Sequence, residues 1–172
     1  MTRLTAQDFQ PEVLQLLDRY VHGDLSRRGF LDQAKARADF VAAARALMAL
    51  PEGNGKVGVV GFCYGGGMAN YLATQVPELQ AAVPFYGGHP PEADVAKIKA
   101  ALLIHYASND ERINAGWPKY EAALKAEGKT FEAYTYPGTE HGFNNDTTPR
   151  FNPEAAKLAW SRTITFFKQR LA

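Results

Sequence analysis

Cysteine is almost absent from this chain of 172 residues, which contains a single one, Cys63. One cysteine allows no disulfide within the chain, and it cannot form a zinc site of four thiolates. An excess of positive charge is also missing, because 19 Lys and Arg residues face 18 Asp and Glu residues and leave a formal net charge of +1. Binding to a phosphate backbone requires a basic surface. We therefore expect no nucleic-acid partner.

Long hydrophobic runs are missing as well. The most apolar stretch, residues 40–50, is short and contains Arg45, whereas a membrane-spanning helix needs about 20 predominantly apolar residues. The hydrophobic share of 46% and the length of the chain are typical of one soluble globular domain. We therefore expect that the protein does not enter a membrane.

The N-terminal part of the chain differs from the rest. Residues 13–20 form a short amphipathic stripe that predicts one isolated helix, and residues 26–31 (SRRGFL) are similar to a twin-arginine export signal. An export signal needs an apolar segment after the arginines, but residues 32–39 are charged. We therefore interpret residues 1–31 as an N-terminal helix and a twin-arginine-like linker, and we expect a cytoplasmic location.

From residue 32 onward, segments with strand-like and helical periodicity alternate. The strands are expected at residues 57–62, 81–86, 101–106 and 131–136, and the helices at residues 33–50, 68–75, 95–99, 114–126 and 154–171. Alternating strands and helices are typical of a parallel sheet with helices on both faces. Residues 32–172 are thus predicted to form an α/β fold whose mostly parallel sheet has about four strands.

The first expected strand runs directly into the glycine-rich turn Gly61-Phe62-Cys63-Tyr64-Gly65. This turn fits the G-x-nucleophile-x-G elbow, in which small residues let a strand and a helix approach closely, with cysteine in the serine position. A buried structural cysteine is the alternative, but the place at the end of an apolar strand favours a nucleophile. A helix that begins after Cys63 would lower the pKa of its thiol, and Tyr64 N–H is the expected oxyanion donor.

A nucleophile on such an elbow needs an orienting acid and a base, which follow it in that chain order. Asp110 comes shortly after the expected strand at 101–106, and His141 comes shortly after the one at 131–136. Ligands bind at the carboxyl ends of the strands in open α/β sheets. We therefore predict that Cys63, Asp110 and His141 form a catalytic triad.

The other acidic and histidine residues fit these roles less well. Glu111 adjoins the predicted acid, but a solvated loop carboxylate is its expected state. His22 lies in the N-terminal segment, His89 in a Gly-His-Pro-Pro turn, and His105 inside a strand, where a buried structural histidine is expected. His141 alone combines the required chain order, a loop position and a flanking glycine.

Together these motifs resemble the dienelactone hydrolases (carboxymethylenebutenolidases), which are α/β-hydrolases with cysteine at the elbow. The resemblance covers residues 31–172, and its most specific segments are GFCYGG (61–66), AVPFYG (82–87), IHYASND (104–110) and YPGTEHGF (136–143). It implies hydrolysis of a small lactone or carboxylic ester through an acyl-thioester intermediate, without a metal or cofactor. It also implies that Cys63 is the nucleophile, His141 the base and Asp110 the orienting acid.

Four further residues are candidates for the substrate site. Basic residues hold the substrate carboxylate in this family, so the resemblance implies that role for Arg150, with a solvated surface arginine as the alternative. The aromatic residues Tyr86, Trp117 and Phe143 either line the acyl pocket or fill the core. The sequence leaves both interpretations of the aromatic residues open.

The chain departs from the family ahead of the elbow. Family members have a block of strands and loops there, which provides the second oxyanion donor and an acidic partner of the cysteine. Here residues 27–31 lead directly into the helix before the elbow, which suggests an internal deletion. The strand at 57–62 is then expected to form an open edge, so we predict a homo-oligomer through that edge. Cover by the N-terminal segment, or poor solubility, are the alternatives.

Two functions of different classes follow from these observations. The first is a lactone or ester hydrolase, in which loss of one oxyanion donor would cost about 2.7 to 4 kcal/mol of transition-state stabilisation. The second is a catalytically impaired remnant that acts as an oligomeric or interaction module. A redox-reactive Cys63 is a third option, against which the lack of a resolving cysteine counts.

Overall fold

The computed structural model describes the backbone of residues 27–172 and the side chains of residues 35–172. The expected helix at residues 13–20 and His22 lie outside the described residues. Residue contacts divide the chain into two units, residues 1–43 and 44–172. The strands and the predicted site residues all belong to the second unit.

Helix α2 (Arg27–Met48) begins earlier than the sequence pattern indicated. The twin-arginine-like segment was expected to be a linker, but the structure has it in a helix from Arg27 onward. Arg, Leu, Gln, Ala and Lys are favourable helix formers, and only Gly29, at a cost of about 1 kcal/mol, opposes the extension. The helix ends before Pro51, which has no N–H and disfavours helical backbone at the preceding residue.

The centre of the second unit is a four-stranded sheet in the order β1-β2-β3-β4. Its strands are β1 (Gly58–Phe62), β2 (Ala81–Phe85), β3 (Ala101–Asn109) and β4 (Phe131–Glu140), and every neighbouring pair is parallel. The predicted α/β class, with a parallel sheet of this size, is confirmed. Strand β1 is an edge strand in this order, as the sequence predicted.

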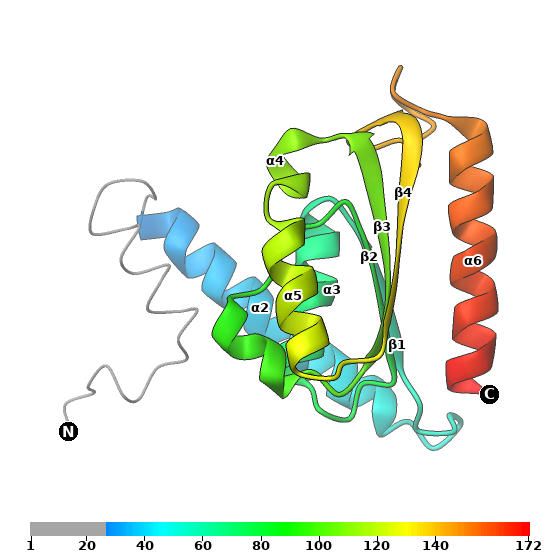
Figure 1. Cartoon of the computed structure of the whole chain (residues 1–172). Coiled ribbons are helices and arrows are strands. Elements are labelled where there is room, and N and C mark those ends of the chain that lie inside the picture. The colour runs from blue at the N-terminus through cyan, green and yellow to red at the C-terminus, as the bar shows by residue number, and fades with distance from the viewer. Residues whose placement is uncertain (1–26) are drawn as a thin grey trace. The chain divides into compact units, whose positions relative to one another are not determined.

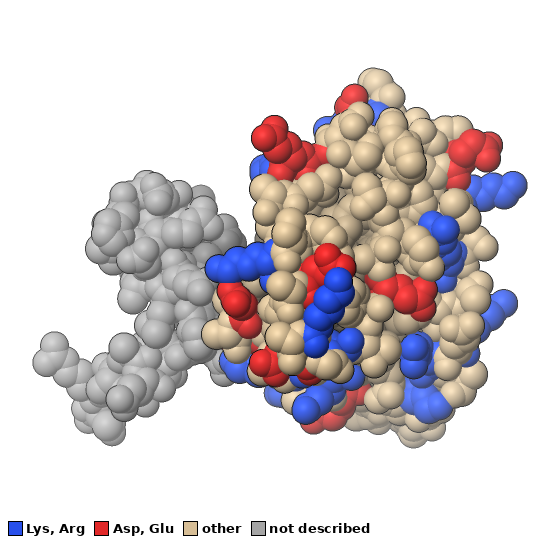
Figure 2. All heavy atoms as spheres, in the orientation of Figure 1, with Lys and Arg blue, Asp and Glu red and all other residues tan. Residues whose placement is uncertain are grey.

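Helices cover both faces of the sheet (Figure 1). Helices α3 (Tyr64–Gln75) and α5 (Trp117–Ala126) lie on one face with the 3₁₀ helix η2 (Glu92–Lys97), and α6 (Pro153–Leu171) lies on the other. Right-handed crossovers between parallel strands produce this arrangement. Figure 2 shows acidic and basic side chains intermixed on the visible face, without a large basic patch.

One hydrophobic core cluster lies between the sheet and α6. All five residues of β2 are buried, as expected for a central parallel strand that is covered on both faces. Phe166 of α6 and Phe143 of the loop after β4 pack into the same cluster. Burial of one such phenylalanine side chain contributes about 1.5–3 kcal/mol to the free energy of unfolding.

Two elements near the candidate site differ from the sequence prediction. The helix expected at residues 114–126 begins only at Trp117, as α5, and a separate short helix, α4 (Glu111–Asn114), precedes it. Proline is tolerated only in the first turn of a helix, so Pro118 fixes the start of α5. Strand β4 continues past Pro137 to Glu140. Proline is tolerated there because β4 is the other edge strand of the sheet, where a missing N–H breaks no ladder.

Candidate active site

Cys63 lies on a strained turn between β1 and α3. Its φ of 54° and ψ of −115° are unfavourable for a residue with a side chain, and its backbone N–H donates to Phe85 O of β2 at 3.1 Å. A Cβ on Gly61 would lie 1.9 Å from Gly65 O, and a Cβ on Gly66 would lie 2.5 Å from Phe85 O. The glycines therefore serve the close approach that the sequence predicted for an elbow.

Helix α3 begins at Tyr64, directly after the exposed thiol of Cys63. The first N–H groups of a helix have no partner within the helix and carry its positive end. No side chain caps this end. The backbone N–H of Tyr64 is the first of these groups and directly follows Cys63 in the chain. Its role as an oxyanion donor stays a prediction.

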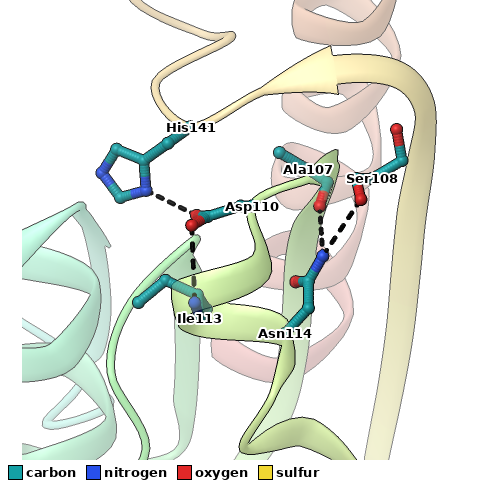
Figure 3. A network of polar contacts seen from close by, with 6 residues as sticks. All are labelled: Ala107, Ser108, Asp110, Ile113, Asn114 and His141. Carbon is teal, nitrogen blue, oxygen red and sulfur yellow. Dashed lines mark hydrogen bonds and ion pairs between the residues drawn. The ribbon is translucent and has the colours of Figure 1, made fainter.

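His141 and Asp110 form a tight pair (Figure 3). His141 Nδ1 lies 2.6 Å from Asp110 Oδ2, and Asp110 Oδ1 accepts from Ile113 N at 3.4 Å. The carboxyl is buried at the N-cap of α4, whereas the imidazole is partly exposed. A carboxylate at Nδ1 favours the tautomer with the proton on Nδ1, which leaves the Nε2 lone pair free to accept a proton.

Asn114 holds the loop that carries the acid. Its Nδ2 donates to Ala107 O at 2.7 Å and to Ser108 O at 3.3 Å, so α4 is tied to the carboxyl end of β3 (Figure 3). These two bonds fix the backbone just before Asp110. The orientation of the carboxylate toward His141 is thus built into the loop.

The pKa of the Cys63 thiol is raised above its usual value. Partial burial is the largest cause of this rise. The positive charges of Arg150 and Arg112 lower the pKa, and the negative charge of the Asp110 carboxylate raises it further; the effect of Arg150 is the largest of these three. The sequence led us to expect a lowered pKa from the helix terminus, and that expectation is wrong because desolvation outweighs the favourable charges. A thiol of this kind needs a base to become nucleophilic.

No hydrogen bond joins the Cys63 thiol to the His141 ring among the described residues. Their common surroundings nevertheless place them in one site, because Asp110 bonds to the imidazole and acts electrostatically on the thiol. Catalytic hydrogen bonds are often long in free enzymes and shorten when the substrate binds.

Tyr86 and Arg150 also lie at this site. Tyr86 follows β2 with a φ of 37°, and its ring centroid lies 5.0 Å from that of His141. Burial, and after it the negative charge of an ionised Cys63, raise the pKa of its hydroxyl. A Cβ on Gly142 would lie 3.7 Å from Arg150 Nη2, so the guanidinium lies over the residue after the imidazole.

The other two predicted substrate residues lie elsewhere. Phe143 is fully buried and packs edge-on against Tyr86, with centroids 5.4 Å apart, so it supports the site from within the core. Trp117 packs against Tyr106 and Phe131, at centroid distances of 5.0 and 6.1 Å. None of its ring contacts is with the elbow or with the loops of the predicted triad. Both residues fit the core interpretation.

Two residues near the thiol were missed in the sequence. Arg112 contributes positive charge at Cys63, and the backbone of Asn144 lowers the pKa of the Tyr86 hydroxyl against the larger effect of burial. Arg112 follows Asp110 by two residues, and Asn144 follows His141 by three. Both lie in loops that the sequence assigns to the site, and that position was the signal that could have identified them.

The remaining described histidines are structural. His105 is fully buried, with Tyr136 Oη 2.9 Å from Nδ1 and Thr163 Oγ1 3.1 Å from Nε2. His89 Nε2 lies 2.8 Å from Tyr106 Oη. Within residues 27–172, no cluster of three or more His, Cys, Asp or Glu residues could hold a metal ion, and no helix is long and apolar enough to cross a membrane.

Two protein-family models match this chain. Residues 24–171 match the Dienelactone hydrolase family, and residues 1–41 match a second family described as YqhI-like. A protein of Saccharolobus solfataricus named "Putative carboxymethylenebutenolidase" is 41% identical over 119 residues, which are 69% of this chain and 46% of that protein. The "Probable 2-oxo-3-(5-oxofuran-2-ylidene)propanoate lactonase" of Bradyrhizobium is 29% identical and covers 82% of this chain and 62% of its own length.

A solved structure shows the same architecture. The crystal structure titled "Putative Dienelactone Hydrolase from Klebsiella pneumoniae" has a TM-score of 0.72 and 29% identity, and it covers 79% of this chain and 61% of that one. The chain spans about half the length of the first curated relatives that it matches, 46% and 51% of two of them. The family match, the parallel sheet and the elbow agree, and the chain belongs to the dienelactone hydrolase family.

Proposed function

We propose that the protein hydrolyses a small lactone or carboxylic ester with Cys63 as the nucleophile. The observation that carries this proposal is the His141–Asp110 pair, 2.6 Å apart, beside a thiol on a strained elbow. A structural cysteine would need neither the strain nor the neighbouring base. The names of the relatives, a carboxymethylenebutenolidase and a lactonase, support the same reaction class.

The first half of the reaction forms an acyl thioester. His141 Nε2 accepts the proton of the Cys63 thiol while the sulfur attacks the carbonyl carbon, and Tyr64 N–H donates to the oxygen that becomes negative. Collapse of this intermediate breaks the bond to the leaving oxygen, which takes the proton from the imidazolium. In a lactone the leaving alcohol stays attached to the acyl group.

The second half releases the acid. A water molecule attacks the thioester carbon while His141 accepts one of its protons, and the sulfur leaves and takes that proton back. Asp110 keeps the imidazole in the required tautomer and stabilises its positive charge. Arg150 is the candidate for holding a substrate carboxylate, because its guanidinium lies beside Gly142, the residue that follows His141.

The experiment is hydrolysis of a chromogenic acetate ester by the full chain, compared with Cys63→Ala and His141→Ala. We expect both variants to lose the activity, and intact-mass spectrometry of the wild type to detect one added acetyl group on Cys63. Leu158→Lys on the surface of α6 is the control for the effect of substitution as such. Hydrolysis that persists unchanged in Cys63→Ala would refute the proposal.

The same assay tests the catalytically impaired alternative. Tyr64 N–H is the donor that the elbow itself provides, and an enzyme that lacks one of two donors is expected to turn over about 10²–10³-fold more slowly. Stoichiometric acetylation of Cys63 without turnover would identify a chain that retains the nucleophile but does not complete the cycle.

A further inference from the structure

Among the residues that the structure describes, the backbone of β1 is hydrogen-bonded on one side only. Val57 O accepts from the N–H of Gln80, the residue before β2, at 2.9 Å, and Cys63 N donates to Phe85 O of β2 at 3.1 Å, so the odd-numbered residues of this segment face β2. Backbone groups alternate in direction along a strand, and those of Gly58, Val60 and Phe62 therefore point to the open side. Among the described residues no group bonds to them.

Nothing in the sequence of β1 protects this edge. Its five residues, GVVGF, include no charge and no proline, and the pairing with β2 continues without a bulge from one end to the other. Natural edge strands avoid association by means of charged side chains, proline, bulges or short length. Of these devices, β1 has only its short length.

One flank of α6 adds apolar surface beside the same edge. A Cβ on Gly58 would lie 2.7 Å from the ring of Phe167 and 3.2 Å from Leu171 Cδ1, so these helix residues lie over β1. Trp160 and Ile164 precede them at helical spacing and share their flank of the helix. Their side chains are 44% and 37% exposed. We call Trp160, Ile164, Phe167 and Leu171 the α6 stripe.

We propose that a second copy of this chain pairs with β1 in the antiparallel direction, around a two-fold axis at Val60. In this register Val60 lies opposite itself, and Gly58 of each copy lies opposite Phe62 of the other. The N–H and C=O groups of all three residues then occur in hydrogen-bonded pairs. The two sheets become one continuous sheet of twice the number of strands.

The same rotation brings side chains together on the α6 face. Gly58, Val60 and Phe62 share this face because side chains alternate along a strand, and Phe62 is 37% exposed there. In the proposed register its ring lies against the outer side of Phe167 and Leu171 of the other copy, the two side chains that cover Gly58 of that copy. The α6 stripes of the two copies flank the new pair of strands.

A second copy fits this surface better than a partner of another kind. An open strand edge needs a strand, and a two-fold interface needs a surface that is complementary to itself. Both the edge and the α6 stripe lie on one side of the second unit and contain no charged residue. The formal net charge of +1 gives little repulsion between copies.

The test is sedimentation velocity of the full chain over the micromolar concentration range, combined with residue-resolved amide exchange by NMR. We expect a reversible dimer. In the dimer the amides of Gly58, Val60 and Phe62 exchange slowly, and dilution makes them fast. The amides of Val59 and Gly61, which bond to β2, stay protected at every concentration and are the internal control.

Substitutions at matched sites test the surface. Trp160→Lys is expected to raise the dissociation constant of the dimer about tenfold or more, which corresponds to about 1.4 kcal/mol, because tryptophan is among the residues that contribute most to interfaces. Leu158→Lys introduces the same charge on the opposite flank of α6, where it lines a groove beside Tyr136, and its side chain is 48% exposed. We expect the control to leave the dimer unchanged.

Several outcomes would overturn the proposal. A monomer at all concentrations refutes it, whether the β1 amides are protected or not, and protection in a monomer would point to cover by another part of the chain. A dimer that Leu158→Lys weakens as much as Trp160→Lys does would place the interface elsewhere. Thermal melts of both variants, followed by circular dichroism, verify that each is folded.

Discussion

His105 makes the stability of the fold dependent on pH, and the structure gives the size of the effect. Its ring is fully buried in β3, and this burial, with a smaller contribution from the charge of Arg162, lowers its pKa from 6.5 to about 3. The folded protein therefore keeps this histidine neutral at pH values at which the unfolded chain protonates it. The stability that the neutral His105 ring contributes is fully present well above pH 6.5, and it is lost as the pH falls from about 6.5 toward 3.

The hydrogen bonds of His105 explain why the neutral ring is preferred. Thr163 Oγ1 donates to Ala159 O at 2.9 Å and so accepts from Nε2–H, which leaves Nδ1 to accept from the Tyr136 hydroxyl. The oxygen of that hydroxyl accepts in turn from Arg162 Nη1 at 3.1 Å. A proton on Nδ1 would face the hydroxyl proton and add a second positive charge near the guanidinium.

Linkage converts these pKa values into a free energy. With 6.5 in the unfolded chain and about 3 in the folded protein, acidification from pH 7 to pH 5 costs about 2 kcal/mol of unfolding free energy from this group alone. The result at pH 5 depends mainly on the unfolded value, because the folded group is still almost fully neutral there. The further step from pH 5 to pH 4 costs about 1.4 kcal/mol of unfolding free energy.

The assay is urea unfolding of the wild type, His105→Gln and Tyr136→Phe at several pH values from 7 to 4. His105→Gln removes the titrating group, so its unfolding free energy should change with pH by about 2 kcal/mol less than that of the wild type between pH 7 and 5. Tyr136→Phe breaks the network but keeps the buried histidine, and it should keep the steep dependence. Equal pH dependence in His105→Gln and the wild type would refute the reasoning.

Three further predictions concern the site. Asp110→Asn should lower kcat for ester hydrolysis by on the order of 10³–10⁴, because the amide no longer fixes the His141 tautomer, with an unchanged circular dichroism spectrum. Gly66→Ala should destabilise the fold by about 1–3 kcal/mol, because its Cβ would lie 2.5 Å from a backbone oxygen of β2. Gly65→Ala, with nothing within 4 Å, should be neutral or stabilising in the same thermal melt. Arg150→Gln should lower kcat/KM about tenfold or more for an ester with a free carboxylate and leave a neutral ester unaffected.

The sequence predicted the parts of this protein that depend on chain order and spacing. The strand, the elbow at Cys63 and the two later loops follow from local patterns, and parallel strands bring their carboxyl ends to one edge of the sheet. The pairing of Asp110 with His141 could therefore be anticipated without a structure. The open edge at β1 was predicted in another way, from the resemblance to the family, whose block of strands ahead of the elbow has no counterpart in this chain.

What the sequence missed depends on packing in three dimensions. The pKa of the Cys63 thiol is raised because burial outweighs the nearby charges, and no local pattern reports that balance. Trp117 could equally have faced the substrate or the core, and only the placement of α5 directs its ring to Tyr106. Pro118 indicates a helix start close to residue 117, whereas the apolar periodicity of residues 114–126 predicts one continuous helix.

Backbone groups alternate in direction along β1, so the groups that position Cys63 are different from the groups at the open edge. Cys63 N donates to Phe85 O, so the position of the nucleophile is fixed by β2, the inner neighbour. The outward groups of Gly58, Val60 and Phe62 take no part in that bond. The bond that fixes the elbow backbone at Cys63 therefore lies within the four-stranded sheet. Whatever pairs with the outer side of β1 can change the association state and the number of oxyanion donors, but the elbow itself does not require it.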